Sequence, residues 1–115
     1  MNFNDIDAYL LSKKAATFDY PFDETTRVYR IASKMFALMG DNKKPCSINL
    51  KCDPIYSLEL RSLYESVKSG YHMNKKHWNT VTMDGDVDDT LLRELIDHSY
   101  ELIYDKRPRK QKELT

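Results

Sequence analysis

RVYRIASKMFALMGDNKKPCSINLKC, residues 27–52, is the stretch that decides the fold of this 115-residue chain. Its last part alternates between two sides of different character, with Cys46, Ile48, Leu50 and Cys52 on one and Ser47, Asn49 and Lys51 on the other. A period of two residues is typical of a half-buried β-strand. Turn-forming residues at 32–34 and 40–45 divide the stretch into three strands, and links this short join antiparallel neighbours.

Three segments around this stretch have apolar residues at helical spacing. The first covers residues 4–15, with Asn4 or Asp5 as the expected cap. The second opens at Asp53-Pro54, because aspartate suits a cap and proline suits the first helical position. Its expected buried stripe consists of Leu60, Leu63, Tyr64 and Val67. The third runs from about residue 88 to 104, and its expected buried residues are Leu92, Leu95, Ile96 and Ile103.

The remaining segments complete the order of elements. Residues 17–26 interrupt the helical pattern with a proline and turn formers, and residues 78–83 are rich in β-forming residues. The order helix, three strands, helix, one or two strands, helix predicts an α+β fold, an antiparallel sheet with helices packed mainly on one face. Ser47, Asn49 and Lys51 should then point away from the helices and form a polar, basic face. We expect one domain over residues 1–106 and a basic, disordered tail over residues 107–115.

Length and composition narrow the class of protein. Hydrophobic residues make up 41% of the chain and charged residues 31%, an ordinary balance for a globular domain. No segment approaches the roughly 20 apolar residues of a membrane span, and the N-terminal residues are acidic where a signal peptide is basic. We therefore expect a cytoplasmic protein, with no membrane partner and with a monomer favoured. Cys46 and Cys52 lie roughly 20 Å apart along an extended strand, so both are expected to be reduced core residues.

The formal net charge of zero conceals blocks of opposite sign. Residues 27–83 contain ten basic and four acidic residues, whereas residues 84–105 contain one basic and eight acidic residues. No carboxylate occurs between Glu65 and Asp84. Segregation of this kind is compatible with a polyanionic partner such as nucleic acid, although bulk charge does not argue for one.

Residues 72–78, HMNKKHW, have four competing interpretations: a metal site, a catalytic cluster, a phosphate-binding surface or a solvated loop. His72 and His77 are five residues apart without an HExxH glutamate, and two adjacent lysines would repel a cation, so no metal is expected. The chain contains no GxSxG, P-loop or GxGxxG motif, so we expect neither an enzyme nor a cofactor. Residue chemistry alone favours a solvated loop with Trp78 anchored in the core.

Several longer stretches resemble the MmcQ/YjbR-like family of small bacterial proteins. The resemblance is carried by GYHMNKKHWNTV at 70–81, DPIYSLELRSLY at 53–64 and LLRELIDHSYELI at 91–103. Residues 20–22, 34–38 and 49–51 add to it, so that it spans nearly the whole chain up to residue 106. HMNKKHW is the most specific of these stretches because it is long and unusual in composition.

The resemblance implies a frataxin-like fold and DNA binding through a double-wing motif, without catalysis. The nucleic-acid contacts expected on this interpretation are Lys34, Lys51, Asn74, Lys75, Lys76 and His77. Trp78 is expected to be structural. Asp23 stands where the family commonly has glycine, and its negative charge opposes a phosphate contact at that point. The alternative is a small-molecule or protein-binding module that uses a cluster of Asn74, His77 and Trp78.

Overall fold

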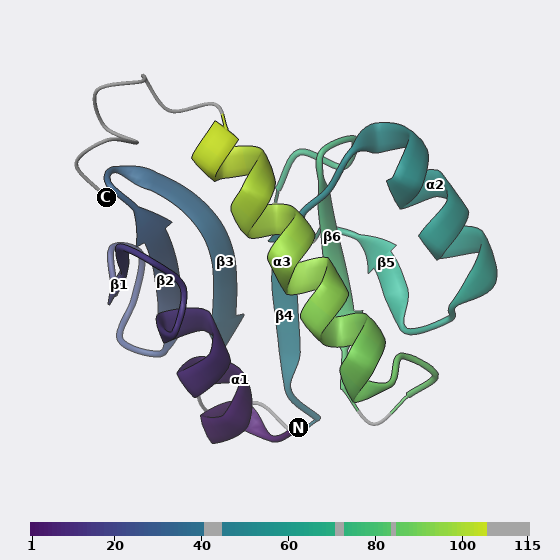
Figure 1. Cartoon of the computed structure of the whole chain (residues 1–115). Helices are drawn as coiled ribbons and strands as arrows, with labels where there is room; N and C mark the ends of the chain where they lie inside the picture. The colour runs from purple at the N-terminus through teal and green to yellow at the C-terminus, as the bar shows by residue number, and fades with distance from the viewer. Residues whose placement is uncertain (41–44, 71–72, 84, 106–115) are drawn as a thin grey trace.

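The computed structural model describes residues 1–40, 45–70, 73–83 and 85–105. The elements are α1 (Phe3–Leu11), β1 (Ala16–Asp19), β2 (Thr26–Ile31), β3 (Lys34–Gly40), β4 (Ser47–Lys51), α2 (Pro54–Leu63), β5 (Val67–Ser69), β6 (Trp78–Thr82) and α3 (Asp89–Asp105) (Figure 1). The tail expected over residues 107–115, and part of the turn expected at 40–45, lie outside the described residues.

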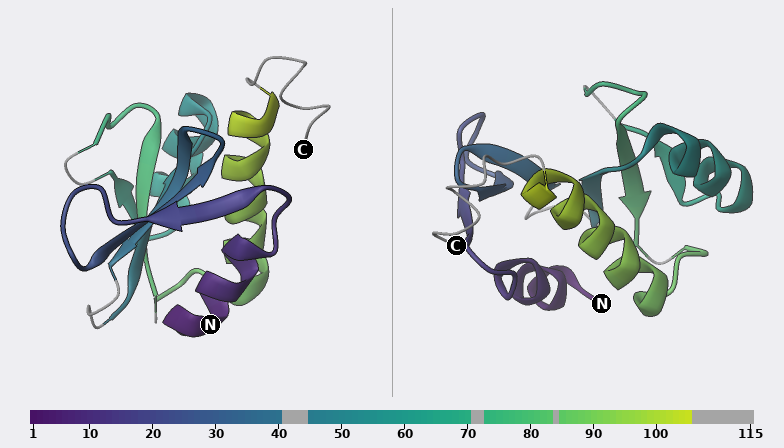
Figure 2. Two further views of the ribbon diagram at one scale, coloured as in Figure 1. Left: turned by 90° about the vertical axis from the view of Figure 1, so that its left-hand side faces the viewer. Right: turned by 45° about the horizontal axis from the view of Figure 1, so that its top comes forward.

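The strands form a six-stranded sheet in the order β1-β2-β3-β4-β6-β5, and every neighbouring pair is antiparallel. Helices α1 and α3 lie on the same face of this sheet, whereas α2 lies beside the edge strand β5 (Figures 1 and 2). The predicted α+β fold with helices mainly on one face is therefore confirmed. We call the face under α1 and α3 the covered face and the opposite one the open face.

The covered face holds the main core. Ile48 and Leu50 of β4 are 1% and 2% exposed, as the alternation in that strand predicted. All four residues predicted to be buried in α3 are buried: Leu92, Leu95, Ile96 and Ile103. Cys52 is buried and Cys46 is only half-buried, so the expectation that both are core residues is wrong for Cys46. Cys46 precedes the first residue of β4 and therefore lies at the margin of the helix–sheet layer. Both cysteines are free thiols.

Helix α1 begins two residues earlier than expected. Its cap is Asn2, whose side chain accepts a hydrogen bond from the backbone N–H of Asp5 at 2.9 Å. The Asp5 carboxylate accepts in return from the backbone N–H of Asn2 at 3.1 Å. This reciprocal pair is a capping box, in which two N–H groups without helical partners are both satisfied. Asp5 is thus the third residue of the helix instead of its cap.

Helix α2 ends earlier than its apolar spacing predicted. Its cap Asp53 and first residue Pro54 are as expected, but Leu63 is 63% exposed and Val67 belongs to strand β5. The Asp86 carboxylate accepts hydrogen bonds from the backbone N–H groups of Glu65 and Ser66 at 2.8 and 3.0 Å. These bonds hold the chain after α2 in an extended conformation, so the predicted helical stripe ends at Leu60. Val67 is fully buried as predicted, but from strand β5.

Strand β1 was predicted as part of an interrupting turn. It pairs with β2 through residues 16–19, yet its residues beyond Ala16 are exposed, and Phe18 is 43% exposed. An edge strand without a buried side has no alternation of apolar and polar residues in its sequence. It forms because the free edge of β2 supplies its backbone hydrogen bonds.

A β-bulge in β3 changes which residues face the helices. Tyr29 pairs with Ala37 and Arg30 pairs with Met35, so Phe36 is the extra residue of the bulged strand. Phe36 is fully buried, and its ring meets that of Tyr100 in α3 edge to face at 5.6 Å. The bulge therefore directs Phe36 into the covered face while its neighbour Met35 lies on the open face.

Candidate functional site

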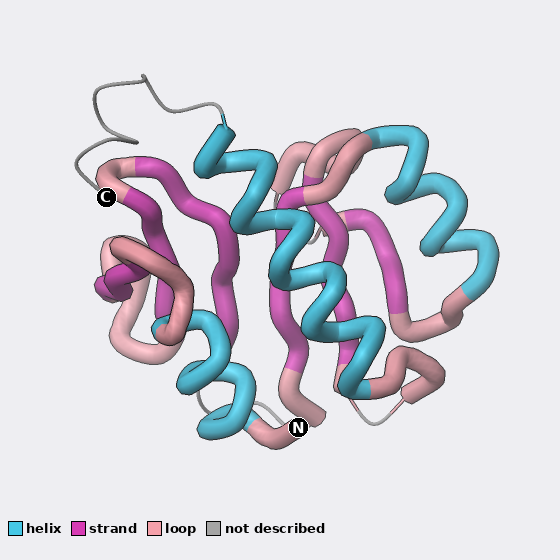
Figure 3. Tube along the Cα trace, viewed as in Figure 1, coloured by secondary structure: helices cyan, strands magenta, loops and turns pink. Residues whose placement is uncertain are grey.

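The sheet brings four lysines of the predicted site to one end. Strand β3 begins at Lys34, β4 ends at Lys51, and β6 begins directly after the loop that carries Lys75 and Lys76. Because β3, β4 and β6 are antiparallel neighbours in that order, these three positions share one end of the sheet (Figure 3). Strands lie about 4.8 Å apart, so β3 and β6 are separated by roughly 10 Å. We call Lys34, Lys51, Lys75 and Lys76 the basic end.

Asn74 shapes the loop that carries two of these lysines. Its side-chain oxygen accepts hydrogen bonds from the backbone N–H groups of Lys76 at 3.0 Å and His77 at 3.2 Å. Its backbone carbonyl accepts from the N–H of Trp78 at 3.0 Å. Lys75 and Lys76 are exposed at the tip of this turn. Asn74 was expected to contact nucleic acid, but its side-chain oxygen accepts hydrogen bonds within the turn itself.

Arg61 of α2 anchors the same loop, and sequence reasoning did not single it out. Its Nε donates to the side-chain oxygen of Asn79 at 2.7 Å, and its terminal nitrogen donates to the backbone carbonyls of Trp78, at 3.2 Å, and Lys75. The only signal in the sequence was a basic residue in the last turn of α2. The guanidinium fork can bond several acceptors at once, which makes it a rigid support for the loop.

Gly70 allows β5 and β6 to approach each other where this loop begins. Its N–H donates to the carbonyl of Trp78 at 2.8 Å. A Cβ atom at this position would lie 2.8 Å from the Cβ of Trp78, closer than side chains approach in proteins. The close approach of Trp78 therefore requires glycine at this position. The backbone angles of Gly70 do not, because its φ is not positive.

Three of the four lysines of the basic end take no part in the ion pairs found among the described residues. Those pairs use the N-terminus, Lys13, Arg27 and Arg30 as cations. Arg30, on the strand next to Lys34, pairs with Asp19 through Nε at 3.0 Å and is thereby neutralised. Lys34, Lys75 and Lys76 take part in none of them.

The open face is not the uniformly polar, basic surface that the alternation of β4 predicted. Val28, Leu38 and Trp78 form a second, smaller apolar cluster there, with Met35 and Met73 packed against it. Trp78 is 8% exposed. Apolar residues occur on this face because β2, β3 and β6 contribute to it as well as β4.

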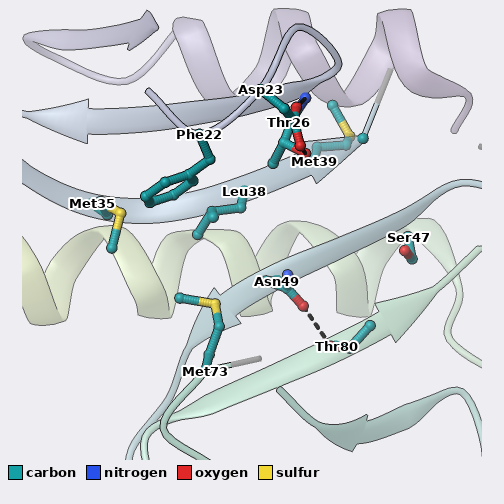
Figure 4. Close-up of a pocket in the computed structure, with 11 residues that line it drawn as sticks. Phe22, Asp23, Thr26, Met35, Leu38, Met39, Ser47, Asn49, Met73 and Thr80 are labelled. Carbon is teal, nitrogen blue, oxygen red and sulfur yellow. Dashed lines mark hydrogen bonds between the residues drawn. The ribbon is translucent and has the colours of Figure 1, made fainter. Parts of the chain in front are cut away.

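A cavity of about 550 Å³ lies on the open face beside this cluster. Its lining mixes apolar and polar side chains: Phe22, Asp23, Thr26, Met35, Leu38, Met39, Gly40, Ser47, Asn49, Met73 and Thr80 (Figure 4). The side-chain oxygen of Asn49 accepts a hydrogen bond from the hydroxyl of Thr80 on the neighbouring strand. Sequence reasoning predicted the outward direction of Ser47 and Asn49, but it gave no sign of the cavity, because residues from four separate segments build it.

Asp23 belongs to the loop at one wall of this cavity. Its carboxylate accepts hydrogen bonds from the backbone N–H groups of Thr25 at 2.9 Å and Thr26 at 2.6 Å. These backbone bonds lower the pKa of Asp23, because they stabilise the charged form. The residue that departs from the family pattern therefore has a local role in holding the loop before β2, and it keeps a negative charge at the cavity.

The cluster proposed as an alternative binding site lies next to the cavity and contributes none of its described lining. The backbone carbonyl of His77 accepts from the N–H of Cys52 at 2.8 Å, and His77 is half-buried. Of residues 73–78, the described part of the HMNKKHW stretch, only Met73 lines the cavity. His72 lies outside the described residues. The binding module based on Asn74, His77 and Trp78 stays a hypothesis.

Within residues 1–40, 45–70, 73–83 and 85–105, no group of three or more histidine, cysteine, aspartate or glutamate side chains comes together in a way that could hold a metal ion. None of the helices in those ranges is long and apolar enough to cross a membrane.

Comparisons with known proteins agree on one family. The YjbR family model matches residues 11–102. The uncharacterized protein YbdF of Escherichia coli O157:H7 is 42% identical over 86 residues, which cover 75% of this chain and 70% of YbdF. The uncharacterized protein YjbR of Escherichia coli K12 is 25% identical over 114 residues, which cover 99% of this chain and 97% of YjbR.

Solved structures show the same relationship. The crystal structure of Deinococcus radiodurans protein DR2400 matches with a TM-score of 0.89 at 34% identity, covering 96% of this chain and 85% of that one. A crystal structure of a Pseudomonas syringae protein matches with a TM-score of 0.77 at 28% identity, covering 90% and 99%. The fold and the sequence thus lead to one conclusion: the chain belongs to the YjbR family.

Proposed function

We propose that this protein binds DNA through the basic end of its sheet and catalyses no reaction. The observation that carries the proposal is topological. Three segments far apart in the sequence place Lys34, Lys51, Lys75 and Lys76 at one end of the sheet, through the antiparallel order of β3, β4 and β6. Lysine side chains bind phosphate as point charges, and phosphate contacts dominate the affinity of proteins for DNA.

The dimensions of the basic end suit a DNA backbone. The roughly 10 Å between β3 and β6 is short enough for lysines from both sides to contact one DNA strand, which carries a phosphate for about every 3.4 Å of helix axis. Arg61 and Asn74 hold the loop between β5 and β6 through hydrogen bonds, and the two exposed lysines project from a fixed turn. A preorganised turn loses less conformational entropy on binding than a flexible one does.

The test is the salt dependence of duplex binding. Each lysine–phosphate contact releases about one counterion, so the Lys75→Ala/Lys76→Ala double variant should flatten the slope of log affinity against log salt by roughly 2. Fluorescence anisotropy with a labelled duplex at several salt concentrations measures both slopes. Thermal stability should barely change, because both side chains are exposed at the tip of the turn.

Arg93→Ala is the control variant. Arg93 is an exposed cation on α3, the helix that packs on the covered face, so its removal changes net charge without touching the basic end. It should leave the slope unchanged. Binding by the double lysine variant with wild-type affinity and slope would show that the basic end does not contact DNA.

A further inference from the structure

The cavity on the open face borders the basic end. Figure 4 shows Phe22, Met35 and Met73 toward one end of the cavity and Ser47 at the other. Met35 follows Lys34 directly, and Met73 lies two residues before Lys75. The end of the cavity with these apolar side chains therefore lies toward the end of the sheet that carries the lysines.

The walls at this end are suited to a flat ring. Figure 4 draws the Phe22 ring beside Leu38, and Phe22 is 64% exposed, so much of its surface is open to a ligand. Met35 and Met73 are half-buried thioethers, which adapt to irregular apolar shapes and contact aromatic rings favourably. An exposed phenylalanine beside a cavity is a typical platform for stacking of a base.

Asn49 supplies a directional polar group at the centre of the cavity. Because Thr80 donates to its side-chain oxygen, the amide nitrogen of Asn49 points away from Thr80 and can donate to a group in the cavity (Figure 4). An amide N–H of this kind can donate to an acceptor atom on the edge of a nucleobase. The hydrogen bond from Thr80 fixes the amide before a ligand arrives.

The distribution of charge around the cavity favours different positions for the base and for the phosphate of a nucleotide. The described lining contains no lysine, arginine or histidine, and it contains the Asp23 carboxylate. Among these described lining residues, a phosphate inside the cavity would meet the Asp23 carboxylate and no positively charged side chain. At the adjoining end of the sheet it would meet Lys34, Lys51, Lys75 and Lys76. The arrangement thus favours an uncharged ring inside and its phosphate outside.

We propose that the cavity receives one unpaired nucleobase while the phosphates of the same nucleotide lie at the basic end, an inference that rests on the proposed function. A volume of about 550 Å³ is within the range of small-ligand sites, roughly 300–1,000 Å³, and leaves room for a base with its sugar. A base in a duplex is paired and stacked and cannot enter. The protein should therefore bind a single strand more tightly than a duplex that offers the same number of phosphates.

The test compares three labelled oligonucleotides by fluorescence anisotropy: a single strand, the same strand with abasic sites throughout its centre, and a duplex of half the length, which carries the same number of phosphates as the single strand. The wild-type protein should bind the intact single strand about 10-fold more tightly than the abasic strand. Phe22→Ala should abolish this difference and leave binding of the abasic strand and the duplex unchanged. Asn49→Ala should reduce it.

Phe18→Ala is the matched control. Phe18 is a partly exposed aromatic residue, 43% exposed, on strand β1, and it does not line the cavity. It should leave all three affinities unchanged. Circular dichroism of each variant confirms that it is folded.

A second measurement identifies the source of the base. Titration with nucleosides and with mononucleotides, monitored by chemical-shift changes at Asn49 and Met73, detects binding of a free base. Saturable shifts that Phe22→Ala abolishes would support the cavity as a nucleobase site. Affinity for a mononucleotide equal to that for the strand would identify the free nucleotide as the ligand.

The two proposals fail in different ways. If the wild-type protein binds intact and abasic strands equally, and the double lysine variant weakens both, the cavity proposal is overturned and DNA binding stands. If no oligonucleotide binds but mononucleotides shift the cavity resonances, DNA binding is overturned and the nucleobase site stands. If neither the strand nor a nucleotide shifts the resonances of Asn49 or Met73, the cavity does not take a base.

Discussion

The two faces of the sheet are built from the same strands and differ in what covers them. On the covered face, Tyr29, Phe36 and Ile48 are at most 1% exposed beneath α1 and α3. On the open face, Phe22 is 64% exposed and a cavity remains between the strands and two loops. A helix with an apolar stripe can fill the space above a sheet, whereas loops contribute only single side chains.

This difference separates stability from binding. The covered face concentrates the apolar burial that stabilises the domain. The open face keeps a smaller apolar cluster of Val28, Leu38 and Trp78, and beside it a cavity and four lysines at one end. Substitutions should therefore have unequal effects on the two faces, and four measurements test that expectation.

The largest effect should come from Phe36 and Met35, adjacent residues that the bulge sends to opposite faces. Phe36→Ala should destabilise the protein by about 4 kcal/mol, within the range for a fully buried aromatic residue. Met35→Ala, on the open face and half-buried, should cost about 1 kcal/mol. Urea unfolding of both variants gives the two free energies. Equal losses would show that the faces do not differ in this way.

Trp78→Ala should have the next largest effect, and it tests whether a buried residue on the open face also contributes to stability. Trp78 is on the open face, yet it is only 8% exposed and packs with Val28 and Leu38. Its removal should cost about 3 kcal/mol, the lower part of the range for a buried aromatic residue. The measurement is again urea unfolding. A loss below about 1 kcal/mol would indicate that the open-face cluster contributes nothing to stability and that Trp78 serves binding alone.

The two thiols should differ by about tenfold or more in their rate of labelling, because the reagent reaches a buried thiol only when the structure opens locally. Cys52 is 4% exposed, and burial raises the pKa of its thiol, which reduces the reactive thiolate. Cys46 is half-buried at the margin of the sheet. Labelling of Cys46→Ser and Cys52→Ser with an aromatic disulfide at pH 8 measures each rate separately. Similar rates in the folded protein would place both thiols at the same depth.

The smallest expected effect is a pH dependence of the stability, caused by His98 on α3. Burial of His98 on α3 lowers its pKa below the ordinary value of 6.5, an effect that the nearby Asp53 opposes. Its Nε2 accepts a hydrogen bond from the backbone N–H of Asp53 at 3.1 Å, so the neutral ring is the form that fits. Below pH 6.5 the unfolded chain binds a proton at this position more readily than the folded chain does. Stability is therefore lost as pH falls through that region.

The measurement for His98 is the difference in unfolding free energy between pH 7.5 and pH 5.5. Wild-type protein should lose more stability over this interval than His98→Gln, whose side chain remains neutral and can still accept the hydrogen bond. His77 and all carboxylates are common to both proteins, so they cancel in the comparison. An identical loss in the two proteins would mean that His98 titrates normally.

The helices and strands that have one buried side were the ones that could be predicted from the sequence. Strand β4 and helix α3 were predicted nearly to the residue, because each alternates between a buried and an exposed side with the period of its own geometry. Strand β1 has no buried side, and β5 is three residues long, so neither has a period to detect. The apolar spacing of Leu60, Leu63 and Val67 was misleading because it continued across the end of a helix into a strand.

Within the candidate site, the sequence alone determined which residues have the right chemistry: exposed lysines beside Asn74 and the outward-facing Ser47, Asn49 and Lys51. Such properties depend on residue type and local period. Only the tertiary structure decided that Lys34 and Lys51 join Lys75 and Lys76 at one end, because the strand order depends on packing between distant segments. It also decided that Arg61 supports the loop and that Phe22 overhangs a cavity, since neither contact is made by residues near in sequence. Burial leaves a pattern along the chain, whereas a meeting of side chains from separate strands leaves none.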